Sequence, residues 1–149
     1  MKFIEKSLEL GTDQNKRILS FQTGKLANAA TSAVLGKMGD TTVLVTVVVG
    51  AEREDIDYFP LQVEYAEKLY AGGRIKGSRW VKREGKPSDE AILNGRLIDR
   101  SIRPLFPKGY KKTVQIIITL LSVDGVNSPD ILSAITVSAA VHASPIPWK

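Results

Sequence analysis

A β-branched run from Thr42 to Val49 constrains the fold of this chain more than any other segment. It reads TVLVTVVV, and such side chains favour extended backbone because their stiff rotamers fit the pleated surface of a sheet. A run without polar alternation predicts a strand that is buried on both faces. The turn residues Met38 to Thr41 come directly before it, so the sequence predicts a hairpin over Ala27 to Val49.

Further strand and helix signals flank this hairpin. The other predicted strands are Ile18 to Phe21, Lys25 to Leu35, Leu61 to Glu67 and Val114 to Ser122. One helix is capped by Ser88 and runs to about Ile102, and a second opens at Ser128-Pro129-Asp130 and runs to about Ala143. The order of four or five strands, a helix, a strand and a helix indicates an α+β or mixed α/β domain.

Composition excludes several classes of protein. The chain has 149 residues, the length of one domain, with no cysteine and a single histidine. A disulfide framework and a cysteine-based zinc site are therefore excluded, and the sequence shows no Cys-His or Ser-His-Asp set of a hydrolase. The amino terminus lacks the apolar core of a secretory signal, and the longest apolar run is about half the length of a membrane helix. We expect a cytoplasmic protein without membrane attachment.

Positive charge is concentrated in the middle of the chain. Between Lys68 and Lys112 there are 13 Lys and Arg residues against 4 Asp and Glu residues, a net charge of +9, whereas the whole chain carries +5. A localised basic region on an otherwise slightly acidic chain indicates a polyanionic partner, either nucleic acid or a phosphate-rich ligand. The alternative is a solvated surface whose charges serve solubility.

Three arginines, Arg96, Arg100 and Arg103, share one stripe of the helix over Asp89 to Ile102. At roughly 100° per residue they fall within about 60° of one another, if the helical path extends to the last of them. The apolar flanks of the stripe are Leu93, Leu97, Ile98 and Ile102. We therefore expect this helix to be mostly buried, with the stripe lining a groove, a channel or a subunit interface.

The charges on this stripe exceed the acids beside them. Asp99 is spaced to pair with Arg96, three residues before it, or with Arg103, four residues after it. At least one guanidinium then requires an external anion, and its fork suits a pair of phosphate oxygens. The alternative is that all three arginines pair with carboxylates elsewhere in the fold.

A glycine-punctuated basic loop, Ala71 to Pro87, directly precedes the arginine helix. Its candidate RNA-binding residues are Trp80, Val81, Lys82, Arg83 and Lys86. An exposed tryptophan among cations stacks on nucleobases while the cations hold phosphates. In the alternative interpretation Trp80 and Val81 anchor the loop to the core and the charges stay in water.

Several strings of residues resemble a known family. SFQTGKLA at 20–27 and MGDTTVLVT at 38–46 resemble the opening strands of the ribonuclease PH fold. KREGKPS at 82–88, RLIDRSIRPLFP at 96–107 and NSPDI at 127–131 resemble the first of the two ribonuclease PH-like cores of polynucleotide phosphorylase. The similarity extends from about Leu19 to Trp148. It implies an α+β fold with a ribonuclease PH-like (ribosomal protein S5 domain 2-like) mixed sheet packed with helices.

The resemblance also implies a function. The family degrades single-stranded RNA, including mRNA, from the 3′ end, with inorganic phosphate as co-substrate, and releases nucleoside diphosphates. It requires Mg²⁺ and forms homotrimers around an RNA channel, with other RNA-degradation proteins as further partners. Its catalytic acids and metal lie in the second core, so we expect no catalytic and no metal-binding residue in this chain. Residues 1–149 are then the first core, truncated before its end and inactive alone.

The family's roles carry over to individual residues of this sequence. Trp80, Val81, Lys82 and Arg83 stand where the family has a Phe-Phe-basic-basic loop that contacts RNA in the channel, and Lys86 stands where arginine is more usual. Replacement of the second aromatic by Val81 removes one stacking ring. The arginines Arg96, Arg100 and Arg103 match a helix whose basic side chains bind phosphate or RNA and face the second core.

Two other functions fit the same residues. The chain could be an enzyme with one core only, such as ribonuclease PH or an exosome-type subunit. It could instead be a non-catalytic RNA-binding or assembly module of a ribonuclease PH-like or exosome-type ring. The sequence downstream of Lys149 discriminates between them, because a second core followed by KH and S1 domains is expected only of the phosphorylase.

Overall fold

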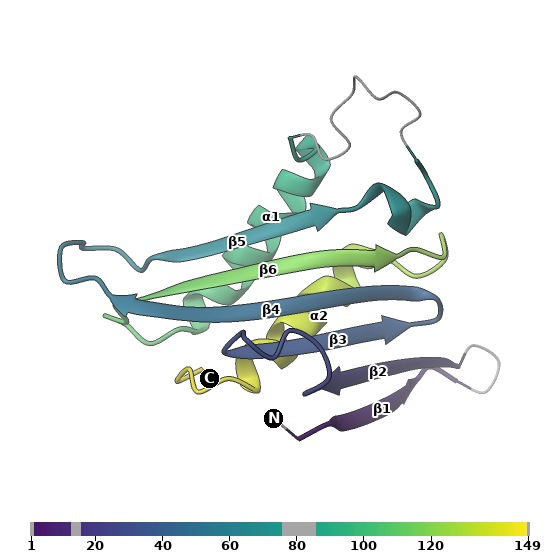
Figure 1. Ribbon diagram of the computed structural model, residues 1–149, viewed down its shortest axis with the longest axis horizontal. Coiled ribbons are helices and arrows are strands. Elements are labelled where there is room, and N and C mark those ends of the chain that lie inside the picture. The colour runs from purple at the N-terminus through teal and green to yellow at the C-terminus, as the bar shows by residue number, and fades with distance from the viewer. Residues whose placement is uncertain (1, 13–15, 76–85, 149) are drawn as a thin grey trace.

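The β-branched run lies in β4 (Thr41–Glu52), the longest strand of a six-stranded sheet in the computed structural model, which describes residues 2–12, 16–75 and 86–148 (Figure 1). The other strands are β1 (Ile4–Leu10), β2 (Arg17–Thr23), β3 (Ser32–Met38), β5 (Leu61–Glu67) and β6 (Lys112–Ser122). Their order across the sheet is β1-β2-β3-β4-β6-β5. Neighbouring strands are antiparallel except β5 and β6, which are parallel.

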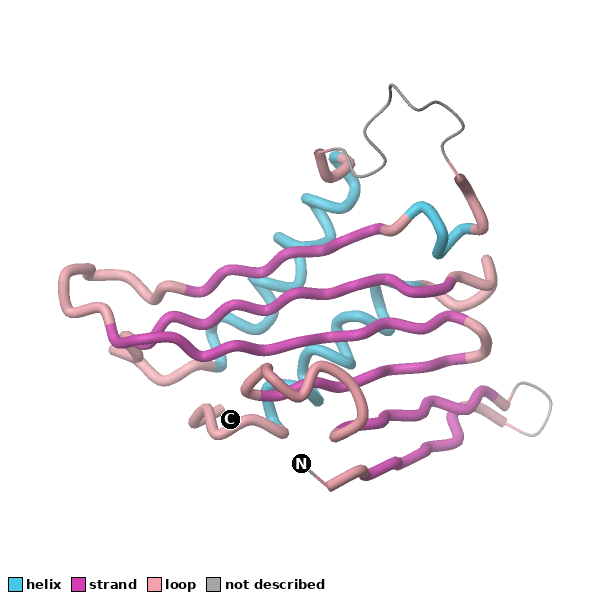
Figure 2. Tube along the Cα trace, in the orientation of Figure 1, coloured by secondary structure: helices cyan, strands magenta, loops and turns pink. Residues whose placement is uncertain are grey.

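Two α-helices lie on one side of this sheet (Figure 2). The first, α1 (Asp89–Ile102), connects β5 to β6 and packs on β5, which is an edge strand. The second, α2 (Pro129–His142), packs on β3 and β4. Short 3-10 turns follow β5 as η1 (Leu69–Gly72) and α1 as η2 (Arg103–Leu105). Within the described residues no helix is long and apolar enough to cross a membrane.

The helices cover one face of β4. Its side chains Val43, Val45 and Val47 point toward the helices and are fully buried. On the opposite face Leu44 and Thr46 are only half-buried, and Val48 is exposed. The expectation that this strand is buried on both faces is therefore wrong for the described part of the chain, because helices line only one face of a largely antiparallel sheet.

The predicted hairpin and both helices are confirmed, and one predicted strand is wrong. The segment Lys25 to Leu35 is mostly a turn, and β3 begins only at Ser32. Two left-handed residues interrupt the extended path, Gly24 at φ 81° and Ala27 at φ 51°. Strand β1 was not predicted; all seven of its residues are exposed, so no buried apolar pattern marks it.

A close approach between β3 and α2 fixes the position of the second helix. Gly36 lies opposite Thr136, and a Cβ on Gly36 would fall well inside contact distance of the Thr136 hydroxyl oxygen and 3.0 Å from its Cγ2. Thr136 is fully buried, and its hydroxyl donates to the Leu132 carbonyl at 2.7 Å. The missing side chain of Gly36 therefore lets the helix lie directly on the strand.

Candidate nucleic-acid interface

The arginine helix begins where the sequence predicts. The Ser88 hydroxyl accepts a hydrogen bond from the Ala91 amide at 3.0 Å and donates to Glu67 Oε2 at 2.9 Å. Asp89 and Glu90 occupy the first turn, where the helix dipole favours negative charge. The cap and the Glu67 contact join the start of α1 to the end of β5.

Only one flank of α1 is buried. The residues that face the sheet are Ala91, Gly95, Ile98 and Ile102. On the other flank the side chains of Leu93 and Leu97 are 64% and 58% exposed. The expectation of a mostly buried helix is wrong in this respect, because no described segment lies outside α1. The outer face of α1, defined here as Leu93, Arg96, Leu97 and Arg100, is thus a surface that combines two cations with two leucines.

Arg96 and Arg100 are both exposed on this outer face. No hydrogen bond or ion pair joins either guanidinium to another described residue, so neither positive charge is neutralised within residues 2–12, 16–75 and 86–148. Unpaired guanidinium groups one helical turn apart are suited to bind the oxygens of phosphate groups.

Arg103 differs from the other two arginines, because its guanidinium bonds within the fold. Its Nε and Nη2 atoms donate to the two carboxylate oxygens of Asp99 at 3.1 and 2.7 Å. Its Nη1 and Nη2 donate to the carbonyls of Phe59 and Leu61 at 3.0 and 3.1 Å. Four of the five donors of a guanidinium are therefore used. The guanidinium also lies over the ring of Phe59, 5.7 Å from its centroid. Arg103 thus acts as a clamp that joins the end of α1 to the start of β5.

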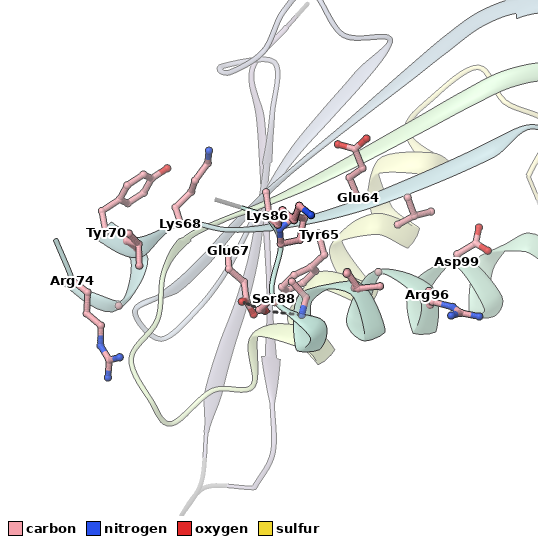
Figure 3. Close-up of a pocket in the computed structure, with 18 of the residues that line it drawn as sticks. Glu64, Tyr65, Glu67, Lys68, Tyr70, Arg74, Lys86, Ser88, Arg96 and Asp99 are labelled. Atoms are coloured by element: carbon pink, nitrogen blue, oxygen red, sulfur yellow. Dashed lines mark hydrogen bonds between the residues drawn. The ribbon is translucent and has the colours of Figure 1, made fainter. Parts of the chain in front are cut away.

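A groove of about 1040 Å³ runs between β5 and α1 (Figure 3). Its floor is apolar and includes Val63, Ala91 and Ile92, and its rim carries cations and carboxylates. The charged and hydroxyl-bearing lining residues are Glu64, Tyr65, Glu67, Lys68, Tyr70, Arg74, Lys86, Ser88, Arg96 and Asp99. Burial raises the pKa of Tyr65 above that of an ordinary phenol.

The predicted RNA-binding loop is described only in part. Trp80, Val81, Lys82 and Arg83 lie outside the described residues. Lys86 is exposed and lines the same groove as Arg96, near the start of α1.

Tyr70 and Arg74 are among the groove residues that were not singled out from the sequence. The η1 turn that carries Tyr70 is fixed by its buried neighbour Ala71, whose carbonyl accepts from the Val123 amide at 3.0 Å. Gly73 closes the turn at φ 66°, and the Arg74 amide donates back to the Leu69 carbonyl at 3.0 Å. The glycine pair at 72–73 is the sequence signal for this turn, and a turn that follows a strand presents its side chains at that strand's end.

The start of α2 offers no open anion site. The carboxylate of Asp124 accepts from the backbone amides of Val126 and Asn127, both at 2.8 Å, and from the Thr41 hydroxyl at 2.9 Å. These donors hold the pKa of Asp124 well below its usual range. The amides before α2 are thus satisfied by the chain's own carboxylate. No group of three His, Cys, Asp or Glu side chains in the described part of the chain could hold a metal ion.

Comparison with known proteins agrees with this fold. Residues 15–147 match the model of the 3′ exoribonuclease family, domain 1. The chain belongs to this family. A polyribonucleotide nucleotidyltransferase of Thermomicrobium roseum is 54% identical over 146 residues, which cover 97% of this chain and 18% of that protein. The same enzyme of Chlorobium chlorochromatii is 49% identical over 149 residues, 99% of this chain and 20% of that protein. The chain thus spans about a fifth of the length of these relatives.

Solved structures of this fold extend the comparison. Rice (Oryza sativa) Rrp46 aligns with a TM-score of 0.64 at 15% identity, over 86% of this chain and 55% of that chain. A chain of the Archaeoglobus fulgidus exosome with RNA bound to the active site aligns with a TM-score of 0.58 at 22% identity, over 98% and 54%. The ribonuclease PH-like fold and the resemblance to polynucleotide phosphorylase, both predicted from the sequence, are confirmed.

Proposed function

We propose that this chain is the first core of a phosphorolytic 3′-to-5′ exoribonuclease, and that the outer face of α1 binds phosphate groups of RNA or inorganic phosphate. The observation that carries this proposal is the exposed pair Arg96 and Arg100, whose charges no described residue neutralises. The curated relatives, which are named polyribonucleotide nucleotidyltransferases, support it.

In phosphorolysis, an oxygen of inorganic phosphate attacks the phosphorus of the last internucleotide linkage. The bond from this phosphorus to the 3′ oxygen of the preceding nucleotide breaks, that oxygen takes up a proton, and a nucleoside diphosphate leaves. Guanidinium groups next to the reacting phosphorus hold the two phosphates in position and stabilise the negative charge of the transition state. Arg96 and Arg100 fit this role, because arginine stays charged and donates from a planar fork. We assign Arg103 a structural role in place of phosphate binding, since Asp99 and two carbonyls already use its donors.

The rest of the reaction falls outside this chain in our proposal. Its described residues offer no set of acids for a metal, so no Mg²⁺ ligand and no proton-transfer step is assigned to them. When bound elsewhere in the enzyme, Mg²⁺ would neutralise charge on the phosphates. We infer from the family resemblance that the whole protein forms a homotrimer in the cytoplasm, meets other RNA-degradation proteins, and contacts RNA through Trp80, Val81, Lys82, Arg83 and Lys86.

A salt series of single-stranded RNA binding tests the proposed interface. The variant Arg96→Gln/Arg100→Gln removes two charges from α1, and Lys6→Gln/Arg17→Gln removes two exposed charges from the hairpin at the opposite edge of the sheet. For two lost phosphate contacts we expect the slope of log affinity against log salt to fall by about 1.4. The control should leave this slope within about 0.3 of wild type. Equal effects of the two variants would contradict the proposal.

A second candidate function, a non-catalytic RNA-binding or assembly module, is favoured by Leu93 and Leu97, which lie exposed beside the arginines as at an interface. Phosphate-dependent release of nucleoside diphosphates discriminates between the two functions. The whole protein should release them and lose activity in Arg96→Gln/Arg100→Gln, whereas this 149-residue chain alone should release none. A whole protein without phosphorolysis would leave only the binding module.

A further inference from the structure

Asp99 lies between two arginines of α1, and only one of them receives its carboxylate. Arg103 takes both carboxylate oxygens, at 2.7 and 3.1 Å, four residues after Asp99. Arg96, three residues before it, is also within helical reach of a carboxylate at this position. Figure 3 shows the Asp99 carboxylate turned away from the Arg96 guanidinium. The pairing with Arg103 therefore leaves the charge of Arg96 uncompensated.

We propose that Arg103 is a positioning residue, which keeps Asp99 away from Arg96 and thereby keeps Arg96 available to a phosphate group. This inference rests on the proposed function of the outer face of α1. Arg103 touches no ligand in it; it acts by occupying the one carboxylate close enough to neutralise a phosphate-binding arginine.

The geometry explains why Asp99 pairs with Arg103 and not with Arg96. The carbonyls of Phe59 and Leu61 accept from its guanidinium on the other side, at 3.0 and 3.1 Å, and they lie just before β5 and at its first residue. The fork is therefore held in place before Asp99 bonds to it, and little side-chain freedom is lost on pairing. Partial burial strengthens the pair, since the Asp99 and Arg103 side chains are 24% and 39% exposed. Arg96 is exposed and has no such anchor.

Removal of Arg103 should therefore weaken ligand binding at Arg96, although Arg103 itself touches no ligand. In Arg103→Gln the Asp99 carboxylate loses its partner, and Arg96, one turn earlier on α1, lies within its helical reach. An Asp99–Arg96 pair would form on the outer face and compete with the ligand. Replacement of Asp99 by asparagine in the same chain abolishes that competition without restoring the clamp.

A double-mutant cycle tests this inference with two readouts, polyanion affinity and stability to urea. The proteins are wild type, Asp99→Asn, Arg103→Gln, their double variant and Arg96→Gln, each measured with poly(U) RNA and with inorganic polyphosphate over a range of salt. We expect Arg103→Gln and Arg96→Gln each to weaken binding about three- to fivefold near 0.1 M salt and to lower the salt slope by about 0.7.

The diagnostic result is a double variant that recovers polyanion affinity but does not regain stability in urea. Asp99→Asn should change the affinity of wild type by less than about twofold but restore Arg103→Gln to within about twofold of wild type. The double variant should unfold no later in urea than Arg103→Gln, because the carbonyls of Phe59 and Leu61 still lack their donor. A purely structural role would leave binding weak in the double variant.

A second ion pair serves as the control for the general effect of losing a charge. Arg53 and Asp55 form a bidentate ion pair in the loop after β4, with both contacts at 2.9 Å. The variants Arg53→Gln, Asp55→Asn and Arg53→Gln/Asp55→Asn make the same charge changes away from α1. Coupling between Asp99 and Arg103 that is no larger than in this control pair would overturn the inference.

The two probes separate this inference from the proposed function. If polyphosphate binding follows the cycle and poly(U) is not bound, the inference stands and the RNA function fails. If both probes bind but the Asp99 and Arg103 effects are additive, the inference fails and the function stands. Absence of binding to both probes overturns both.

Discussion

Substitution of Gly36 by alanine tests how tightly α2 is seated on the sheet. The new Cβ would collide with the Thr136 hydroxyl and lie 3.0 Å from its methyl carbon, a distance that real contacts do not tolerate without a shift. Thr136 has little freedom to turn away, because it is fully buried and its hydroxyl donates to the Leu132 carbonyl at 2.7 Å. The helix must therefore move off β3.

The expected magnitude follows from these contacts. Overpacking a filled core costs about 1–3 kcal/mol, and we expect about 3 kcal/mol for Gly36→Ala because the clash meets a fully buried, hydrogen-bonded side chain. Thr136→Ala alone removes a buried methyl and a hydrogen bond, for about 1 kcal/mol. In the double variant the two Cβ atoms would be 3.1 Å apart, which needs a shift of a few tenths of an ångström. We expect it to lose only about 2 kcal/mol, so the coupling is about 2 kcal/mol.

Urea unfolding followed by circular dichroism measures the free energy of unfolding of wild type, of the two single variants and of the double variant. Gly50→Ala is the matched control, because a Cβ at Gly50 in β4 meets its nearest neighbour, Thr113 Cβ, at an ordinary 3.4 Å. It should change stability by less than about 0.5 kcal/mol. Additive effects of Gly36→Ala and Thr136→Ala, or a Gly36→Ala effect no larger than that of Gly50→Ala, would refute the close approach.

Two further substitutions probe the helix and the polar cluster. Gly95→Ala should raise the melting temperature by a few degrees and leave RNA binding unchanged. A Cβ there lies an ordinary 3.5 Å from the Val63 carbonyl oxygen, and alanine stabilises a helix by up to about 1 kcal/mol relative to glycine. A lower melting temperature would contradict this. The pKa of Asp124 is depressed in the folded chain, so its contribution to stability is present above about pH 4, the unfolded value, and is lost as pH falls further toward the folded value. Asp124→Asn should therefore destabilise the chain at pH 7 and flatten the loss of urea resistance below pH 4, and an unchanged pH profile would contradict this role.

Local chemistry made the helices predictable. The hydroxyl of Ser88 and the acids after it satisfy the first amides of α1 without any tertiary partner, so the start is readable from a few residues. The turn before β4 is readable for the same reason, since Gly39 adopts φ 61° there. Strand β1 has the opposite character. It pairs with β2 in a hairpin, from Ile4 opposite Thr23 to Leu10 opposite Arg17, but its exposed residues carry no burial pattern.

The candidate site shows where local reasoning stops. A helical projection places Arg96, Arg100 and Arg103 on one stripe, and the cap geometry of Arg103 confirms that the helical path reaches it. What separates the arginines is the strand below them, because α1 ends over the start of β5, where the carbonyls of Phe59 and Leu61 face the last guanidinium. Those partners lie more than forty residues earlier in the chain, and the packing of α1 on β5 brings them within reach.

The different roles of the three arginines follow from their positions along α1. At its carboxyl end Arg103 donates to Asp99 and to the carbonyls of Phe59 and Leu61, so it is satisfied within the fold and adds rigidity. One and two turns earlier the helix face points away from the sheet, and no described acceptor reaches Arg96 or Arg100. Their charge is therefore available to a phosphate only because the helix is fixed elsewhere. A fixed carboxyl end and unsatisfied charge one and two turns before it are what a preorganised anion site requires.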